Sequence, residues 1–188
     1  MENPTNIQKN ERNLARMIQC FTHSVSLPIG DFILTEVDGF LCALCSDPEL
    51  QDLKKQLGRY LSRELQFTEK PTDTLVLAQA QLQEYFSGRR REFQLPIRLY
   101  GSDFQQAVWQ QLQQIPYGST TTYGTIATAL NQKGARAVGT AVGRNPLPII
   151  IPCHRVLPQS GDLGNFSMQG GAAVKAFLLD LEGAHYNK

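Results

Sequence analysis

The sequence predicts an α+β protein, in which a small N-terminal α/β module, a hairpin sheet with helices, precedes a mostly helical C-terminal domain. Two apolar, β-favouring runs flank Asp38-Gly39, a strong tight-turn signal that predicts a hairpin over residues 30–45. After Gly101 the chain changes character, and two short helical segments joined by a glycine-containing turn have the outline of a helix-turn-helix. We therefore expect one domain over residues 1–100 and a second over 101–188.

The N-terminal module holds two predicted helices and one more strand. Asp47 and Pro48 suit the N-cap and the first position of a helix. The apolar stripe of this helix at helical spacing is Leu50, Leu53, Leu57, Leu61 and Leu65. A second helix is expected over residues 73–87 and ends at Gly88. Residues 93–99 have the composition of a further strand.

The C-terminal domain is predicted to open with a helix from a capping box, in which Ser102 and Gln105 satisfy the first free backbone donors reciprocally. Short helices are then expected over residues 122–130 and 135–142. Three prolines exclude helix from residue 145 to 153 and favour extended backbone. The last helix is expected over residues 172–181.

Composition limits the class of protein. The 188 residues include 18 basic and 17 acidic side chains, so no global field attracts nucleic acid or membranes. The segment from Met1 is polar and unlike a signal peptide, and no run approaches the ~20 apolar residues of a membrane span. The four cysteines are too few for a disulfide framework, and their spacing does not provide a closed metal site. We expect a cytoplasmic protein with free thiols and no metal.

One short run combines a nucleophile, a proton acceptor and a cation: Pro152-Cys153-His154-Arg155. A free thiol with a pKa of about 8.5 is mostly protonated at neutral pH, and a neighbouring His or Arg can lower that pKa. The alternative is a buried core pair, because unpaired cysteine is among the most buried residue types. A Cys–His relay also needs the chain to turn at the cysteine, or a bridging water, and a carboxylate to orient the imidazole. The residues themselves leave Asp162, Asp180 and Glu182 open as that carboxylate.

Three features precede or follow this run. Gly139 lies inside a predicted helix of small residues, where it indicates either close helix packing or close approach to a nucleic-acid backbone, with Arg136 as the one long side chain. Asn145 before Pro146 forms either a simple Asx turn or a link between that helix and the cysteine. The glycine-punctuated segment 161–171 is either a hairpin connection or a pocket wall with Phe166 as an aromatic contact.

Together these motifs resemble the O6-alkylguanine-DNA alkyltransferases, also called methylated-DNA–protein-cysteine methyltransferases. The N-terminal module is loosely similar, and the correspondence is close from about Gly101 to Gly183. The motifs that carry the resemblance, in the family's order and at close to its spacing, are Arg136-Ala137-Val138-Gly139, Asn145-Pro146, Pro152-Cys153-His154-Arg155-Val156 and Leu181-Glu182-Gly183.

The resemblance implies the roles of the reacting residues. Cys153 would accept the alkyl group from O6 of a guanine flipped out of duplex DNA. His154 would withdraw the thiol proton through a water, and Glu182 would orient His154. Asn145 would be the hinge between the recognition helix and the reactive cysteine, and Tyr123 would donate a hydrogen bond to the leaving guanine.

The resemblance also implies contacts with DNA and the base. Arg136 would fill the gap that the flipped nucleotide leaves, and the helix-turn-helix would use the minor groove. Further contacts with the DNA, the base or its alkyl group are expected from Ala135, Gly139, Gln105, Pro148, Val156, Ser167 and Phe166. The implied partner is double-stranded DNA with alkylated guanine, and O4-alkylthymine is a second candidate lesion. We expect no cofactor, a single-turnover monomer, and a location with the DNA, which is the nucleus if the source is eukaryotic.

Two departures from the family pattern stand out. The loop carries Phe166 where the family commonly has tyrosine, with about two extra residues before Gly170-Gly171, which leaves the preferred alkyl size open. The N-terminal Cys and His residues do not fall where some members bind zinc. Two rival readings are a sensor that binds alkylguanine without transfer, which the presence of Cys153 disfavours, and a multiple-turnover cysteine hydrolase that has no need of Arg136.

Overall fold

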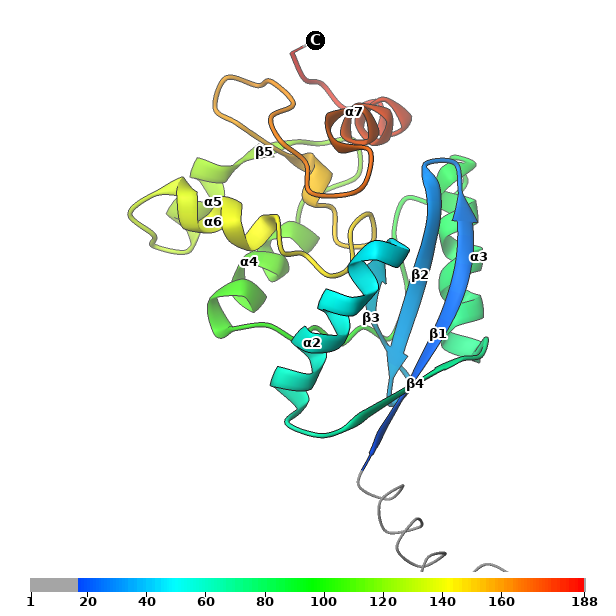
Figure 1. Cartoon of the computed structure of the whole chain (residues 1–188). Helices are drawn as coiled ribbons and strands as arrows, with labels where there is room; N and C mark the ends of the chain where they lie inside the picture. Colours follow the sequence, from blue (N-terminus) through cyan, green and yellow to red (C-terminus); the bar gives the residue numbers. More distant parts are fainter. Residues whose placement is uncertain (1–16, 188) are drawn as a thin grey trace, which may run out of the picture.

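A computed structural model describes residues 17–187 of the chain, so the segment from Met1 lies outside the described residues. Its N-terminal part is a four-stranded sheet in the order β3-β2-β1-β4 (Figure 1). The strands are β1 (Ile18–Leu27), β2 (Gly30–Val37), β3 (Phe40–Cys45) and β4 (Leu65–Glu69). The predicted hairpin is confirmed, because β2 and β3 pair antiparallel across Asp38-Gly39. In contrast, β4 pairs parallel to β1.

Two helices cover opposite faces of this sheet, since successive strand side chains alternate between the faces. The first, α2 (Leu50–Leu61), follows a 3-10 turn, η1 (Asp47–Glu49), and packs Leu57 against Cys20 and Cys42. The second, α3 (Asp73–Phe86), packs its apolar side against β1, β2 and β3. The helix predicted over residues 73–87 is thereby confirmed.

Four details of the N-terminal predictions were wrong or incomplete. The N-cap before α2 is Ser46, whose side chain and backbone bond Glu49, and not Asp47. Leu65 is not part of the helical stripe, because Ser62 in a left-handed conformation ends α2 and Leu65 begins β4. Residues 93–99 form no regular strand, and only Ile97 bridges to Leu41. The long strand β1, which lies between β2 and β4, was not anticipated.

The C-terminal part is built from helices placed as the sequence predicts. It opens with α4 (Asp103–Gln113), whose capping box of Ser102 and Gln105 is present. The helix-turn-helix consists of α5 (Tyr123–Ala129) and α6 (Ala135–Val142). A 3-10 turn, η2 (Cys153–Arg155), then leads to β6 (Val156–Leu157), which pairs with β5 (Thr121–Thr122). The last helix is α7 (Gly171–Glu182).

One apolar cluster joins the two parts of the molecule. It contains Leu82 and Tyr85 of α3 together with Trp109 of α4 and Val138 of α6. The indole N–H of Trp109 donates to the Ala141 carbonyl at 2.9 Å, which ties α4 to the end of α6. In Figure 1 the sheet with α2 and α3 lies beside the helices α4 to α6, and α7 lies across the top. None of the helices within residues 17–187 is long and apolar enough to cross a membrane.

Candidate active site

Cys153 lies where the chain stops being extended and turns. The Cys153 N–H donates to the Ile151 carbonyl at 2.8 Å, and η2 begins at the cysteine itself. Cys153 and His154 therefore do not alternate as they would on a strand, which meets the first condition that a Cys–His relay requires. The thiol residue is only 4% exposed and lines a pocket of about 400 Å³. This volume falls in the range of small-molecule sites in proteins.

The segment before the cysteine is held in place by Asn145. Its amide Nδ2–H donates to the Ile151 carbonyl at 2.8 Å, and its Oδ1 accepts from the Leu147 N–H at 3.0 Å. Inside the loop thus closed, Ile149 adopts a φ of 75°, a conformation that a β-branched residue rarely takes and that costs about 1–3 kcal/mol. Asn145 therefore does more than form an Asx turn, because its side chain hydrogen-bonds to both ends of the strained segment between α6 and Cys153.

His154 is buried between the cysteine turn and the end of α7. Its side chain is 0% exposed, and Nε2 lies 2.9 Å from Glu182 Oε1. The other ring nitrogen, Nδ1, has no hydrogen-bond partner among residues 17–187. Burial lowers the pKa of His154 below its ordinary value, and Glu182 opposes this effect only in part. The ring is therefore neutral at pH 7, with Nδ1 free to accept a proton.

Glu182 is the carboxylate that orients the imidazole. Asp162 and Asp180, the other two candidates, are exposed and bond Ser160 and Tyr186 instead. Arg155 binds Glu182 through two bonds, from Nε to Oε2 at 2.8 Å and from Nη2 to Oε1 at 2.9 Å. Burial raises the pKa of Glu182, but the bonds to His154 and Arg155 outweigh it and hold the pKa well below its ordinary value.

Two more donors reach the same carboxylate. The Tyr85 hydroxyl donates to Oε1 at 2.7 Å, and the Gly118 N–H donates to Oε2 at 3.1 Å. Gly118 has a φ of 74°, and a Cβ there would lie 2.9 Å from the Glu182 carbonyl oxygen, so this close approach requires glycine. Arg155 is thus committed to Glu182 and, through Nη1, to the Ile115 carbonyl at 2.6 Å. It does not serve as the cation beside the thiol that the sequence suggested.

The cation near the thiol is Lys175 of α7. Its ammonium is fully buried and donates to the Val156 carbonyl at 2.7 Å and to the Leu163 carbonyl at 2.5 Å. Burial lowers the pKa of Lys175 to about 8, and the charge of Cys153 opposes that shift. Burial raises the pKa of the Cys153 thiol, whereas the Asn145 hydrogen bond and the charge of Lys175 lower it. The net direction is upward, so this thiol needs a base to become a nucleophile.

The pocket in front of Cys153 is walled by three of the predicted elements. Tyr123 and Gly139 come from the helix-turn-helix, and Asn165, Phe166 and Ser167 come from the glycine-punctuated segment, which is therefore a pocket wall. A Cβ at Gly139 would meet only the Tyr123 ring, at 3.9 Å. Tight helix packing is thus not the reason for this glycine, and its open side faces the pocket. Burial and the nearby cysteine charge raise the pKa of Tyr123, which keeps its hydroxyl protonated as a donor.

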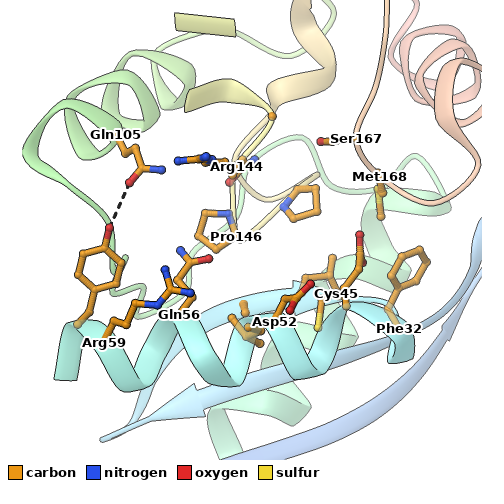
Figure 2. A pocket seen from close by; sticks show the side chains of 18 residues that line it. Phe32, Cys45, Asp52, Gln56, Arg59, Gln105, Arg144, Pro146, Ser167 and Met168 are labelled. Atoms are coloured by element: carbon orange, nitrogen blue, oxygen red, sulfur yellow. Dashed lines mark hydrogen bonds between the residues drawn. The ribbon is translucent and has the colours of Figure 1, made fainter. Parts of the chain in front are cut away.

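A second, larger cleft of about 860 Å³ lies between α2 and the C-terminal part (Figure 2). It shares Gly143 and Ser167 with the Cys153 pocket. Figure 2 shows Asp52, Gln56 and Arg59 of α2 on one side and Arg144 and Pro146 opposite them. The cleft therefore joins the wall of the reactive pocket to the N-terminal part.

The other predicted contact residues lie around these two cavities. Pro148 and Gln105 line the larger cleft, where Gln105 Oε1 accepts from the Ser102 N–H and the Tyr60 hydroxyl. Gln105 is mostly buried and committed to capping α4, so it is placed away from the Cys153 pocket. Val156 is buried as well, and its carbonyl is taken by Lys175. Ala135 and Arg136 lie on the exposed side of α6.

Comparison with known proteins identifies the architecture. Residues 103–184 match the family model described as "6-O-methylguanine DNA methyltransferase, DNA binding domain". The constitutive methylated-DNA–protein-cysteine methyltransferase of Bacillus subtilis is 40% identical over 164 residues, which span 86% of this chain and 94% of the relative. This chain belongs to the methylated-DNA–protein-cysteine methyltransferase family. A relative of the same name from Mycolicibacterium paratuberculosis is 43% identical over 78% of this chain and 88% of its own.

Solved structures of this methyltransferase family resemble this chain over most of its length. Mycobacterium tuberculosis OGT, solved in complex with DNA, matches with a TM-score of 0.73 and 38% identity, over 87% of this chain and 92% of that one. The O6-methylguanine-DNA methyltransferase of Pyrococcus kodakaraensis matches with a TM-score of 0.61 and 27% identity, over 88% and 99%. The likeness therefore includes the N-terminal sheet, beyond the part that the family model matches.

Two residues of this candidate site, Lys175 and Tyr85, were not predicted from the sequence, although one of them had left a signal there. Lys175 lies on the apolar stripe of α7 with Leu178, Leu179 and Glu182, at the spacing i, i+3, i+4 and i+7. A lysine and a glutamate on a buried stripe indicate buried charge with a role. Tyr85 left no such signal, because an aromatic residue on the buried side of a helix is ordinary core. Within residues 17–187 no three Cys, His, Asp or Glu side chains gather to hold a metal ion.

Proposed function

We propose that this methyltransferase-family protein repairs DNA by moving the alkyl group of O6-alkylguanine to the sulfur of Cys153. The observation that carries the proposal is the placement of the thiol at a pocket, with His154 next to it on the chain and hydrogen-bonded to the buried Glu182. A cysteine, a neutral histidine and an orienting carboxylate form the standard arrangement for an activated sulfur nucleophile.

The proposed reaction is a displacement at the alkyl carbon. The thiol proton passes through a water to His154 Nδ1, since Nε2 is turned toward Glu182. The sulfur–carbon bond forms while the carbon–O6 bond breaks, and the electron pair goes to guanine. Tyr123 donates a hydrogen bond to the leaving base, and guanine recovers one proton, so that the products are S-alkylcysteine and unmodified guanine. A thioether has no acyl carbon for water to attack, so each molecule acts once.

The surface of α6 supports access to the base from the minor groove. Ala135, Arg136 and Thr140 are exposed on this helix, and Gly139 opens onto the reactive pocket. Small side chains allow a helix to approach a narrow groove, and an inserted side chain can occupy the space that a flipped nucleotide vacates. We propose that Arg136 has this role and that the guanine enters between Tyr123 and Phe166.

A mass measurement tests the function. The protein is incubated with a duplex oligonucleotide that contains O6-methylguanine, and its peptides are weighed. We expect one methyl group per protein on the peptide that contains Cys153, and unmodified guanine in the DNA. Tight binding without a mass gain would favour a lesion sensor instead, and repeated turnover of thioesters or peptides would favour a hydrolase.

Arg136→Ala is expected to slow transfer from duplex DNA about tenfold, because the gap left by the flipped nucleotide would stay unfilled. Transfer from the free base O6-methylguanine should be unchanged, since no duplex is opened. The measurement is the single-turnover rate with each substrate. Arg63→Ala removes one exposed positive charge from the N-terminal part and is the matched control. Equal slowing with both substrates would contradict the proposed role of Arg136.

A further inference from the structure

The carboxylate of Glu182 accepts a hydrogen bond from the other half of the molecule. Five hydrogen bonds converge on its two oxygens, from His154, Arg155 (two bonds), Gly118 and Tyr85. The first three residues belong to the C-terminal part. Tyr85 belongs to α3, which packs on the N-terminal sheet. Among the described residues, it is the N-terminal part's only hydrogen-bond donor to this carboxylate.

Tyr85 is held rigidly in a position that points its hydroxyl at Oε1. The residue is 0% exposed. Its ring packs edge-on against Phe86 and Tyr117 at centroid distances of 5.3 and 6.2 Å, and tilted against Phe93 at 5.6 Å. A ring fixed on three sides cannot swing its hydroxyl to another acceptor. The 2.7 Å bond is therefore a lasting contact between α3 and the end of α7.

The same oxygen also bonds the histidine of the proposed relay. Oε1 lies 2.7 Å from the Tyr85 hydroxyl and 2.9 Å from His154 Nε2. These two donors and Arg155 Nη2 all draw on the charge of one oxygen atom, so the bond from Tyr85 limits how strongly that oxygen attracts the imidazole proton. It also helps to fix the orientation of the carboxylate, because it holds Oε1 from α3, outside the C-terminal part.

We propose that Tyr85 is a positioning residue for alkyl transfer, through which the N-terminal part holds Glu182 against His154 and sets the basicity of the imidazole. The inference rests on the proposed function in one respect, namely that His154 is the base that activates Cys153. It adds that the N-terminal part belongs to the proton relay as well as to the fold.

The expected effect of Tyr85→Phe follows from the loss of one donor. Phenylalanine fills the same volume, so the aromatic cluster is kept while Oε1 retains more of its charge for His154. The imidazolium is then better stabilised, and the pKa of His154 rises. Because transfer requires neutral His154, we expect the acidic limb of the rate profile to move up by about half a pH unit. Well below the midpoint of that limb, the transfer rate should fall about threefold in consequence.

Other charged groups around the pair remain in place in this variant. The other ionisable groups that act on Glu182, His154 or Tyr85 are Arg155, Lys175 and Tyr117, and Arg91 lies over the Tyr117 ring at 5.4 Å. Cys153 adjoins His154 in the chain. None of them gains or loses a covalent group in Tyr85→Phe, so a shift of the profile reports on the lost hydroxyl.

The test measures single-turnover transfer from pH 5 to 9 for the wild type, Tyr85→Phe and Phe93→Leu. Phe93 packs on the same ring but has no polar side-chain atom that could bond the carboxylate, so Phe93→Leu should lower stability and leave the midpoint unchanged. Incorporation of 3-fluorotyrosine at position 85 provides a more acidic donor and should move the midpoint downward. Wild-type midpoints in both position-85 variants would overturn the proposal and leave Tyr85 a packing residue.

A second readout separates this inference from the proposed function. The ¹⁵N shifts of the His154 imidazole, followed by NMR as the pH changes, report its protonation without any transfer. If the wild type transferred no alkyl group, the proposed function would fail, yet the His154 titration would still be expected to shift upward in Tyr85→Phe. An unchanged titration in a folded variant would contradict the role of Tyr85 whatever the reaction proves to be.

Discussion

Cys153→Ser is expected to abolish alkyl transfer while the protein still folds and still binds duplex DNA that contains O6-methylguanine. Serine keeps the shape of the side chain in the pocket, but its hydroxyl is far less acidic than a thiol and the neutral His154 cannot ionise it. Removal of the nucleophile costs on the order of 10⁴-fold or more in enzymes with covalent mechanisms. The measurement is methyl transfer in a single turnover, together with fluorescence anisotropy for binding.

Cys45→Ser is the matched control for this experiment. Cys45 is also a free, partly buried cysteine, but it lies at the end of β3 and lines the larger cleft instead of the reactive pocket. The control should transfer one methyl group per molecule at close to the wild-type rate. Transfer that persists in Cys153→Ser, or is lost in Cys45→Ser, would place the acceptor elsewhere.

Glu182→Gln is expected to impair both transfer and stability. The glutamine cannot stabilise the imidazolium, and loss of general-base assistance typically costs 10²–10⁴-fold, so we expect transfer to slow about 10²-fold. The substitution also leaves the buried Arg155 without its counter-ion. Breaking one partner of a buried ion pair costs about 3–5 kcal/mol. Urea unfolding at pH 7 measures the second effect, and Glu92→Gln, an exposed site, should change stability by less than about 0.5 kcal/mol.

The difference in the free energy of unfolding between the wild type and Glu182→Gln should depend on pH, and the pKa of Glu182 sets the direction of that dependence. The folded-state pKa of Glu182 lies well below its ordinary value of 4.5. A carboxylate with a depressed pKa contributes stability that is fully present above its unfolded-state pKa and is lost as the pH falls toward the folded-state pKa. The wild type should therefore lose this contribution below about pH 4.5, and the difference from Glu182→Gln should shrink there. A difference that stays constant from pH 7 to pH 3 would contradict the ion-pair explanation.

Local signals in the sequence predicted most helices but only half of the sheet. Capping residues, helical spacing and the Asp38-Gly39 turn are local, and they mark α3, α4 and the β2–β3 hairpin correctly. β1 and β4 pair in parallel across 40 or more residues, and such pairing depends on distant partners that no local pattern reveals. Residues 93–99 have strand composition, but Pro96 lacks the backbone N–H that a ladder needs.

The sequence by itself determined the candidate reactive run, because Cys153 and His154 are neighbours and the motifs around them keep the order and spacing of one family. The family resemblance also pointed to Glu182 as the carboxylate that orients His154. Only the tertiary structure decided that the chain turns at Cys153, which cation lies near the thiol and where Arg155 points. These outcomes depend on burial and on contacts between residues up to 97 positions apart, as with Tyr85 and Glu182. The interaction of two charges depends on their separation and on the exclusion of water, and neither exists until the two halves of the chain are packed together.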